Sequence, residues 1–212
     1  MNPSYLIRGA LVLACLMETF GAAEAASLKI VKVGAPAINC VFNPTCQVVV
    51  TDSLGTIPVP AITGKAPWTD YGPAVLQSRA YAGAAGAPAA GETAYVYRMV
   101  MSFAVGAACV NALKLDVGPI KKHYYNLSGA LADVFVTTTG GLGTIGLASA
   151  AEDGETVTFT FEKPVCAGSA PEKGDTSFFF GFAAAGAPMK TTAKVQVVSG
   201  PAVDTPARAP QH

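Results

Sequence analysis

The chain has 212 residues with 14 basic and 14 acidic side chains, so its net charge is zero, and charged residues make up only 13% of it. This balance provides no basic surface for nucleic acid and no attraction to an acidic membrane. The charged fraction is well below the typical ~25% and fits a secreted β protein better than a cytosolic enzyme. The length is sufficient for one well-filled domain and does not require two.

The N-terminal residues have the layout of a secretory signal peptide. Arg8 precedes an apolar run at residues 9–17 (GALVLACLM), and residues 23–25 (AEA) match the A-x-A cleavage pattern. We therefore expect cleavage after Ala25. The apolar run is far shorter than the ~20 residues of a membrane span, so a transmembrane anchor is not expected. Lipidation at Cys15 is an alternative, since the residues before it resemble a lipoprotein signal. The mature protein is therefore expected to be extracellular or periplasmic.

Cleavage at this position leaves four cysteines, and an even number in an exported chain predicts disulfides. Three pairings are possible. We favour Cys40–Cys46, whose five-residue spacer closes a small loop, together with Cys109–Cys166, which joins distant strands. A four-cysteine zinc site needs two short spacings and the sequence has one, so no metal site is expected.

Alternation of large apolar and other residues predicts strands along most of the mature chain. The segment 95–105 (YVYRMVMSFAV) gathers six large side chains on one face only if it is extended. The expected strands, in chain order, lie near 28–33, 46–51, 75–81, 95–105, 113–117, 133–139, 144–149, 156–161, 176–183 and 191–198.

The connecting segments agree with an all-β fold. Asp153-Gly154 is a hairpin turn signal, residues 82–91 (AGAAGAPAAG) predict a flexible loop, and no segment of ten or more mature residues has a helical period. We predict a signal peptide at 1–25, a single β-sandwich at 26–198 and a disordered Pro/Ala tail at 199–212. The sandwich, Ig-like or jelly-roll-like, should have roughly 8–11 strands.

The sequence contains one motif associated with a cofactor, and its context excludes that use. Residues 141–146 (GLGTIG) fit the G-x-G-x-x-G pattern of dinucleotide-binding proteins, which requires a helix at the third glycine. The residues that follow predict another strand instead. The motif is interpreted as a turn or bulge, and no cofactor is expected.

Two kinds of hydrolytic site can be compared with the sequence. A Ser-His-Asp triad would depend on His123, because His212 lies in the expected tail. The sequence also contains no G-x-S-x-G motif to present the serine. Paired carboxylates need no histidine, so a polysaccharide hydrolase with two converging acidic residues stays an alternative. The sequence favours a non-catalytic module.

Aromatic residues in or beside predicted loops indicate a binding role. The candidate ligand-binding residues are Trp68, Tyr71, Tyr124 and Tyr125, whose rings can stack on a sugar or anchor a protein. The expected partner is a carbohydrate or a cell-surface protein. A self-assembling surface or matrix subunit, joined through sheet edges, is a further alternative.

Three segments carry a resemblance to other proteins: 140–146 (GGLGTIG), 164–168 (PVCAG) and 177–182 (SFFFGF). They resemble stretches of uncharacterised secreted bacterial proteins of β-sandwich type, over roughly residues 75–198. The resemblance implies the fold and secretion, and it implies no activity and no functional residue.

Overall fold

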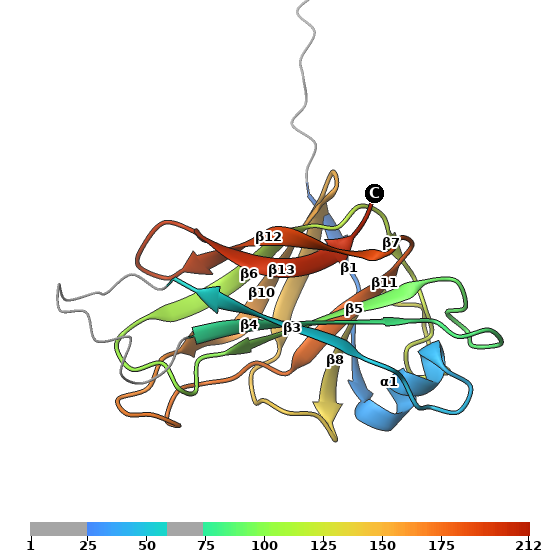
Figure 1. Ribbon diagram of the computed structural model, residues 1–212, viewed down its shortest axis with the longest axis horizontal. Coiled ribbons are helices and arrows are strands. Elements are labelled where there is room, and N and C mark those ends of the chain that lie inside the picture. The colour runs from blue at the N-terminus through green and yellow to red at the C-terminus, as the bar shows by residue number, and fades with distance from the viewer. Residues whose placement is uncertain (1–24, 59–73) are drawn as a thin grey trace, which may run out of the picture.

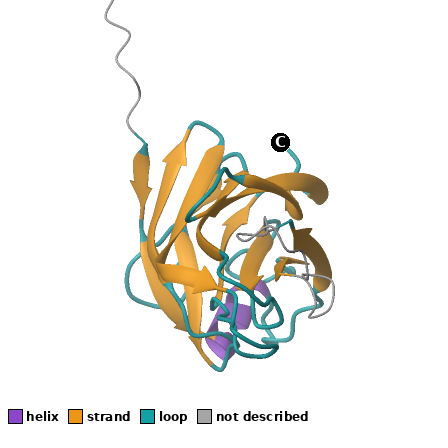
Figure 2. Cartoon of the chain, turned by 90° about the vertical axis from the view of Figure 1, so that its left-hand side faces the viewer, coloured by secondary structure: helices purple, strands orange, loops and turns teal. Residues whose placement is uncertain are grey.

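The computed structural model describes residues 25–58 and 74–212, which form two β-sheets packed face to face (Figure 1). This arrangement confirms the expected all-β sandwich. The described residues form thirteen strands and one helix, α1 (Ala35–Phe42). The expected signal peptide lies outside them, apart from its last residue. The two layers are seen from one end in Figure 2.

The first sheet has six strands, and every neighbouring pair is antiparallel. In spatial order it consists of β1 (Ala26–Leu28), β9 (Leu147–Asp153), β10 (Thr156–Cys166), β6 (Cys109–Asp116), β12 (Pro188–Val197) and β13 (Val203–Pro210). β9 and β10 are joined by the predicted turn at Asp153-Gly154, where Gly154 has φ +60°. A left-handed backbone of this kind favours glycine.

The second sheet has seven strands. It consists of β2 (Ile30–Gly34), β8 (Val134–Thr139), β11 (Phe179–Ala184), β5 (Thr93–Val100), β4 (Ala74–Ala82) and β3 (Thr51–Ile57), with the short β7 (Ile120–Lys121) also paired to β11. The β2–β8 pair is parallel and the other pairs are antiparallel. The chain passes from the first sheet to the second at Lys29, between β1 and β2. There the backbone N–H of Lys29 donates to the buried carboxylate of Asp133 (2.8 Å).

The core between the sheets is built by the alternation that the sequence predicts. Tyr95, Tyr97 and Met99 of β5 point inward and meet the inner rings of the neighbouring strands. The ring of Phe159 on β10, for example, lies 5.2 Å from that of Phe180 on β11, so the two sheets contact each other through aromatic packing. The strand predicted at 95–105 is shorter than expected, because β5 ends at Val100 and Phe103 beyond it is exposed.

Both predicted disulfides are confirmed. Cys109–Cys166 joins the start of β6 to the end of β10, where the two residues are direct cross-strand partners. Cys40–Cys46 links α1 to the turn that follows it. The first bridge therefore fixes one end of the six-stranded sheet, and the second fixes the exit of the helix.

The expected disordered tail is wrong. Residues 203–210 form β13, which pairs with β12 over eight residues from Val203 to Pro210. Proline is tolerated in a strand at a sheet edge, because its missing N–H can face away from the partner strand. The outer side of β13 lies against β3, where a Cβ on Gly55 would come within 1.9 Å of the Pro206 carbonyl oxygen. The sandwich therefore extends past residue 198.

A second apolar cluster lies on the outer face of the seven-stranded sheet, beneath α1. The helix begins after Gly34 with Pro36 in its first turn, a position that tolerates proline. Its buried residues Ile38, Val41 and Phe42 cover outward-facing side chains of the sheet. The helix lies at one end of this face (Figure 2), and Ala89 and Tyr125 from two loops belong to the same cluster.

Across the described ranges, no helix is both long and apolar enough to cross a membrane.

Candidate functional site

The aromatic residues predicted to bind a ligand have different positions in the structure. Trp68 and Tyr71 lie outside the described residues. Tyr124 is 51% exposed, whereas the neighbouring Tyr125 is only 1% exposed. The structure therefore places one of the two described rings at the surface.

Tyr125 is part of the packing between the loop that carries it and the seven-stranded sheet. Its hydroxyl accepts a hydrogen bond from the Ala183 N–H (3.0 Å) and lies within donating distance of the carbonyl oxygens of Lys121 (3.3 Å) and Asp133 (3.4 Å). Burial raises the pKa of this hydroxyl well above its usual range, because ionisation would place a charge in an apolar region. Tyr125 is a structural residue in this arrangement.

Tyr124 borders a shallow cavity of about 310 Å³. Its neighbours there include the exposed Leu127 and Leu131 and the imidazole of His123. His123 is held by Glu92, whose carboxylate lies 2.5 Å from its Nε2. The cavity thus combines an exposed ring with aliphatic side chains, and its histidine is already paired.

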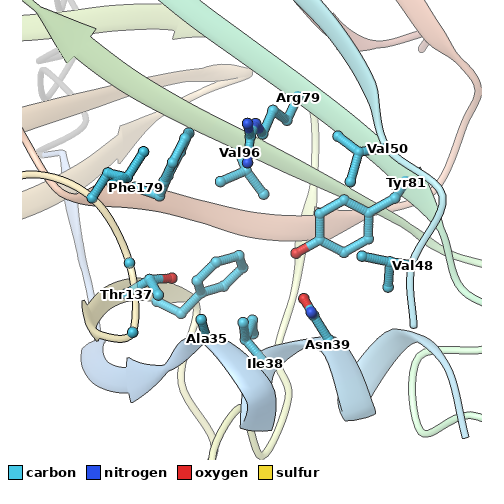
Figure 3. A pocket seen from close by; sticks show the side chains of 14 residues that line it. Ala35, Ile38, Asn39, Val48, Val50, Arg79, Tyr81, Val96, Thr137 and Phe179 are labelled. Carbon is cyan, nitrogen blue, oxygen red and sulfur yellow. The ribbon is translucent and has the colours of Figure 1, made fainter. Parts of the chain in front are cut away.

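A second cavity, of about 230 Å³, lies between α1 and the outer face of the seven-stranded sheet (Figure 3). The helix forms one wall and the extended segment 48–50 forms another. The floor consists of outward-facing side chains from β4, β5, β8 and β11. We call this cavity the helix–sheet pocket. Its lining residues are Ala35, Ile38, Asn39, Val48, Val50, Arg79, Tyr81, Val96, Phe135, Thr137, Gly140, Gly141, Leu142 and Phe179.

Most of this lining is apolar. Strands with one face in the core usually place polar residues on the other face, but here Val96, Phe135 and Phe179 point away from the core and are still buried. At the rim, Val50 and Leu142 are exposed to solvent. The pocket is therefore a hydrophobic recess on the outside of the sandwich, and its apolar surface continues onto the rim.

Three neutral polar side chains line the same space: Asn39 of α1, Tyr81 of β4 and Thr137 of β8. The Tyr81 hydroxyl and the Asn39 amide point toward each other across the pocket (Figure 3). Each of these hydroxyl and amide groups can donate and accept hydrogen bonds. Ligand sites typically place a few such polar groups in an apolar lining, so these three can hydrogen-bond a ligand.

Arg79 supplies a positive charge at the pocket wall. Its Nε donates to the carboxylate of Asp52 on β3 (2.7 Å), and its guanidinium lies 4.3 Å from the centre of the Phe179 ring. Arg98, on the neighbouring strand β5, lies 5.3 Å from the same ring. Two guanidinium groups therefore share one aromatic ring, and among the described residues only Arg79 of the two is paired with a carboxylate.

The charge of Arg98 is poorly compensated. Burial, and then the neighbouring charge of Arg79, lower the pKa of its guanidinium from the usual value. Its Nε is buried and has no hydrogen-bond partner in the part of the chain that the structure describes. This region of the sheet face consequently has an excess of one positive charge.

Arg79 also acts on Tyr81, two residues along the same strand. Burial raises the pKa of the Tyr81 hydroxyl well above its usual range, and the positive charge of Arg79 opposes this shift only in part. The hydroxyl therefore keeps its proton at neutral pH and can donate it in a hydrogen bond.

The glycine-rich motif forms part of the pocket rim. Gly140, Gly141 and Leu142 line the pocket, and the segment leads into β9 rather than a helix. A Cβ on Gly143 would lie 2.0 Å from the Ser177 carbonyl oxygen, so the turn needs a glycine to pass this backbone. The motif is a turn, as interpreted from the sequence.

Acidic residues do not gather in these cavities. No aspartate or glutamate lines either cavity, both of which are formed by described residues. Elsewhere, Asp116, Glu155 and His212 bring one ligand atom each to within 4.8 Å of one another, which would suit a metal ion, but all three are exposed. The His212 Nε2 already lies 3.5 Å from each carboxylate, so contacts among the three side chains account for this cluster.

Sequence reasoning missed the helix–sheet pocket. The sequence contains one signal for this pocket. Arg79 and Arg98 occur among apolar residues of two adjacent strands, at positions that alternate with core residues. In the comparisons with known proteins, no family model, curated protein or solved structure matches the chain. The resemblance to secreted bacterial β-sandwich proteins therefore stays a prediction.

Proposed function

We propose that this protein is a secreted, non-catalytic binding module whose ligand occupies the helix–sheet pocket. The observation that carries the proposal is the combination of a recessed apolar surface with three neutral polar side chains in its lining. Ligand sites are typically apolar recesses with a few convergent polar groups.

The volume of the pocket limits the size of the ligand. About 230 Å³ corresponds to roughly eight water-sized groups at ~30 Å³ each, and it is below the ~300–1,000 Å³ of drug-sized sites. A compound with about eight non-hydrogen atoms, such as a six-carbon chain with a small polar head, has the right size. Ligands this small bind weakly, with a Kd of roughly 1 mM or somewhat lower.

Secretion is part of the same proposal. The two disulfides favour an oxidising compartment such as the periplasm or the cell exterior. The signal-peptide layout of the first 25 residues gives the route.

The experiment uses calorimetric titration of the mature protein with six-carbon compounds that differ in their head group. Ala35→Leu places a larger side chain in the pocket, because Ala35 lines it from the first turn of α1. The matched control is Ala37→Leu, on the same helix but outside the pocket lining. We expect Ala35→Leu to abolish binding and Ala37→Leu to retain it. Equal binding by both variants, or no binding of any six-carbon compound to the unmodified protein, would overturn the proposal.

A further inference from the structure

We propose that the ligand of the helix–sheet pocket is a small monocarboxylic acid, with its carboxylate at Arg79 and its apolar part against the helix and sheet. This inference rests on the proposed function and adds the chemical class of the ligand. It is carried by the charges, the hydrogen-bond donors and the apolar lining of the pocket.

The positive charges beside the pocket exceed the negative ones. Arg79 and Arg98 flank the Phe179 ring at 4.3 and 5.3 Å, and one carboxylate, Asp52, neutralises only one of them. Asp52 lies on the exposed side, with 45% of its side chain accessible, and does not line the pocket. A single negative charge placed at Arg79 from the pocket side would complete the neutralisation of the pair.

The polar side chains that line the pocket are rich in hydrogen-bond donors. The hydroxyls of Tyr81 and Thr137 and the amide of Asn39 can all donate, as can the guanidinium of Arg79. No carboxylate lines this pocket, whose walls are formed by described residues. The site therefore fits a group that accepts several hydrogen bonds, and it disfavours an ammonium group, which could only donate and would be repelled by Arg79.

The apolar lining of the pocket favours an organic acid over an inorganic anion or a sugar. Ile38, Val48 and Val96 would have no role in holding phosphate or sulfate. A sugar would need an open ring face for stacking, and the Phe179 ring is already covered by the two guanidinium groups. A short hydrocarbon group would bury against these side chains and gain ~25 cal/mol for each Å² removed from water.

The experiment compares three probes of equal chain length on the mature protein: hexanoate, hexanamide and hexylamine. Charge-assisted hydrogen bonds are stronger than neutral ones, so we expect hexanoate to bind about tenfold or more tightly than hexanamide, and hexylamine not to bind. Equal affinity for hexanoate and hexanamide would overturn the inference that the ligand is a carboxylate, and the proposal that the pocket binds a ligand would still stand. Failure of all three probes would overturn both proposals.

Two substitutions change the charge balance in opposite directions. Asp52→Asn removes the competing carboxylate and should tighten hexanoate binding several-fold, without changing hexanamide binding. Asp204→Asn is its matched control, because Asp204 forms an exposed ion pair with Lys194 on the other sheet. Unchanged hexanoate affinity in Asp52→Asn, or equal tightening in both variants, would contradict the inference.

Arg98→Gln should bring hexanoate affinity close to that of hexanamide, because it removes the excess charge. Arg98→Lys should keep most of the preference, and Arg208→Gln, which alters an arginine outside this pocket, should keep all of it. Thermal unfolding of each variant shows whether it is folded. A folded Arg98→Gln protein that still prefers hexanoate tenfold would refute the role of this charge.

Discussion

Tyr125→Phe provides a direct test of the view that Tyr125 is structural. The change removes one oxygen atom and keeps the ring, which packs 4.9 Å from Phe135. It leaves the Ala183 N–H, a buried donor near the end of β11, without its acceptor at 3.0 Å. A buried donor left without a partner costs about 1–3 kcal/mol. We therefore expect the free energy of unfolding to fall by that amount.

The assay is denaturant unfolding with the disulfides intact, supported by thermal melts. For a chain of this size, each 1 kcal/mol lowers Tm by roughly 2–4 °C. The matched control is Tyr124→Phe, since the Tyr124 side chain is 51% exposed and exposed substitutions usually change stability by less than ~0.5 kcal/mol. If the two variants unfolded at the same denaturant concentration, the hydrogen bonds assigned to Tyr125 would not contribute as argued.

Three further predictions concern stability. Replacing Cys109 and Cys166 by alanine should lower the free energy of unfolding by ~4 kcal/mol, and replacing Cys40 and Cys46 by ~2 kcal/mol, because the first bridge closes the longer loop; denaturant unfolding that ranks the two pairs in the reverse order would contradict this. Gly55→Ala should cost at least about 1–3 kcal/mol, because its Cβ would meet the Pro206 carbonyl, whereas Gly200→Ala meets nothing within 4 Å; equal Tm values for these two variants would show that β3 and β13 are not in contact. Burial raises the pKa of four tyrosine hydroxyls, so the folded protein keeps protons that the unfolded chain releases, and the free energy of unfolding should decrease as pH rises above ~10; an absorbance titration that ionises these tyrosines near pH 10 in the folded protein would refute the burial argument. The four residues are Tyr81, Tyr95, Tyr97 and Tyr125.

Local sequence patterns were sufficient to predict the central strands. In β5 and β10 the large residues recur at every second position, and this pattern alone places Tyr95, Tyr97 and Phe159 in one core. The disulfide pairing followed from loop length and from the expectation that Cys15 belongs to a cleaved signal peptide. These features depend on neighbours along the chain, or on a simple count, and therefore need no knowledge of the tertiary structure.

The edges of the fold depend on partners that the sequence does not reveal. Residues 203–210 have the Pro/Ala composition of a disordered tail, and they become a strand because β12 offers its edge along their whole length. In the loop 83–91, expected to be flexible, Ala87 and Ala89 are buried, and the Ala89 N–H donates to the Val41 carbonyl of α1 (2.9 Å). The strand expected near 46–51 begins only at Thr51. Cys46 belongs to the turn after α1, where the disulfide ties it to Cys40, and residues 47–50 form no regular strand.

The pocket was not predictable for the same reason. The apolar residues of α1 and the outward positions of β4, β5, β8 and β11 are compatible with several arrangements. Only the packing of the helix on the outer face of the sheet encloses a cavity between them. Arg79 and Asp52, 27 residues apart in sequence, are brought together by the β3–β4 register. Aromatic residues in loops were the more visible signal, and they directed attention to Tyr124 instead.

The most direct test of the central claim is amide chemical-shift mapping by NMR on the mature protein, titrated with hexanoate. The account predicts that the shifted amides cluster around the helix–sheet pocket, at Asn39, Tyr81, Val96 and Phe179. It also predicts that Ala35→Leu removes these shifts and Ala37→Leu does not. Saturable shifts confined to the cavity beside Tyr124, or no saturable shifts at all, would contradict the assignment of the helix–sheet pocket as the ligand site.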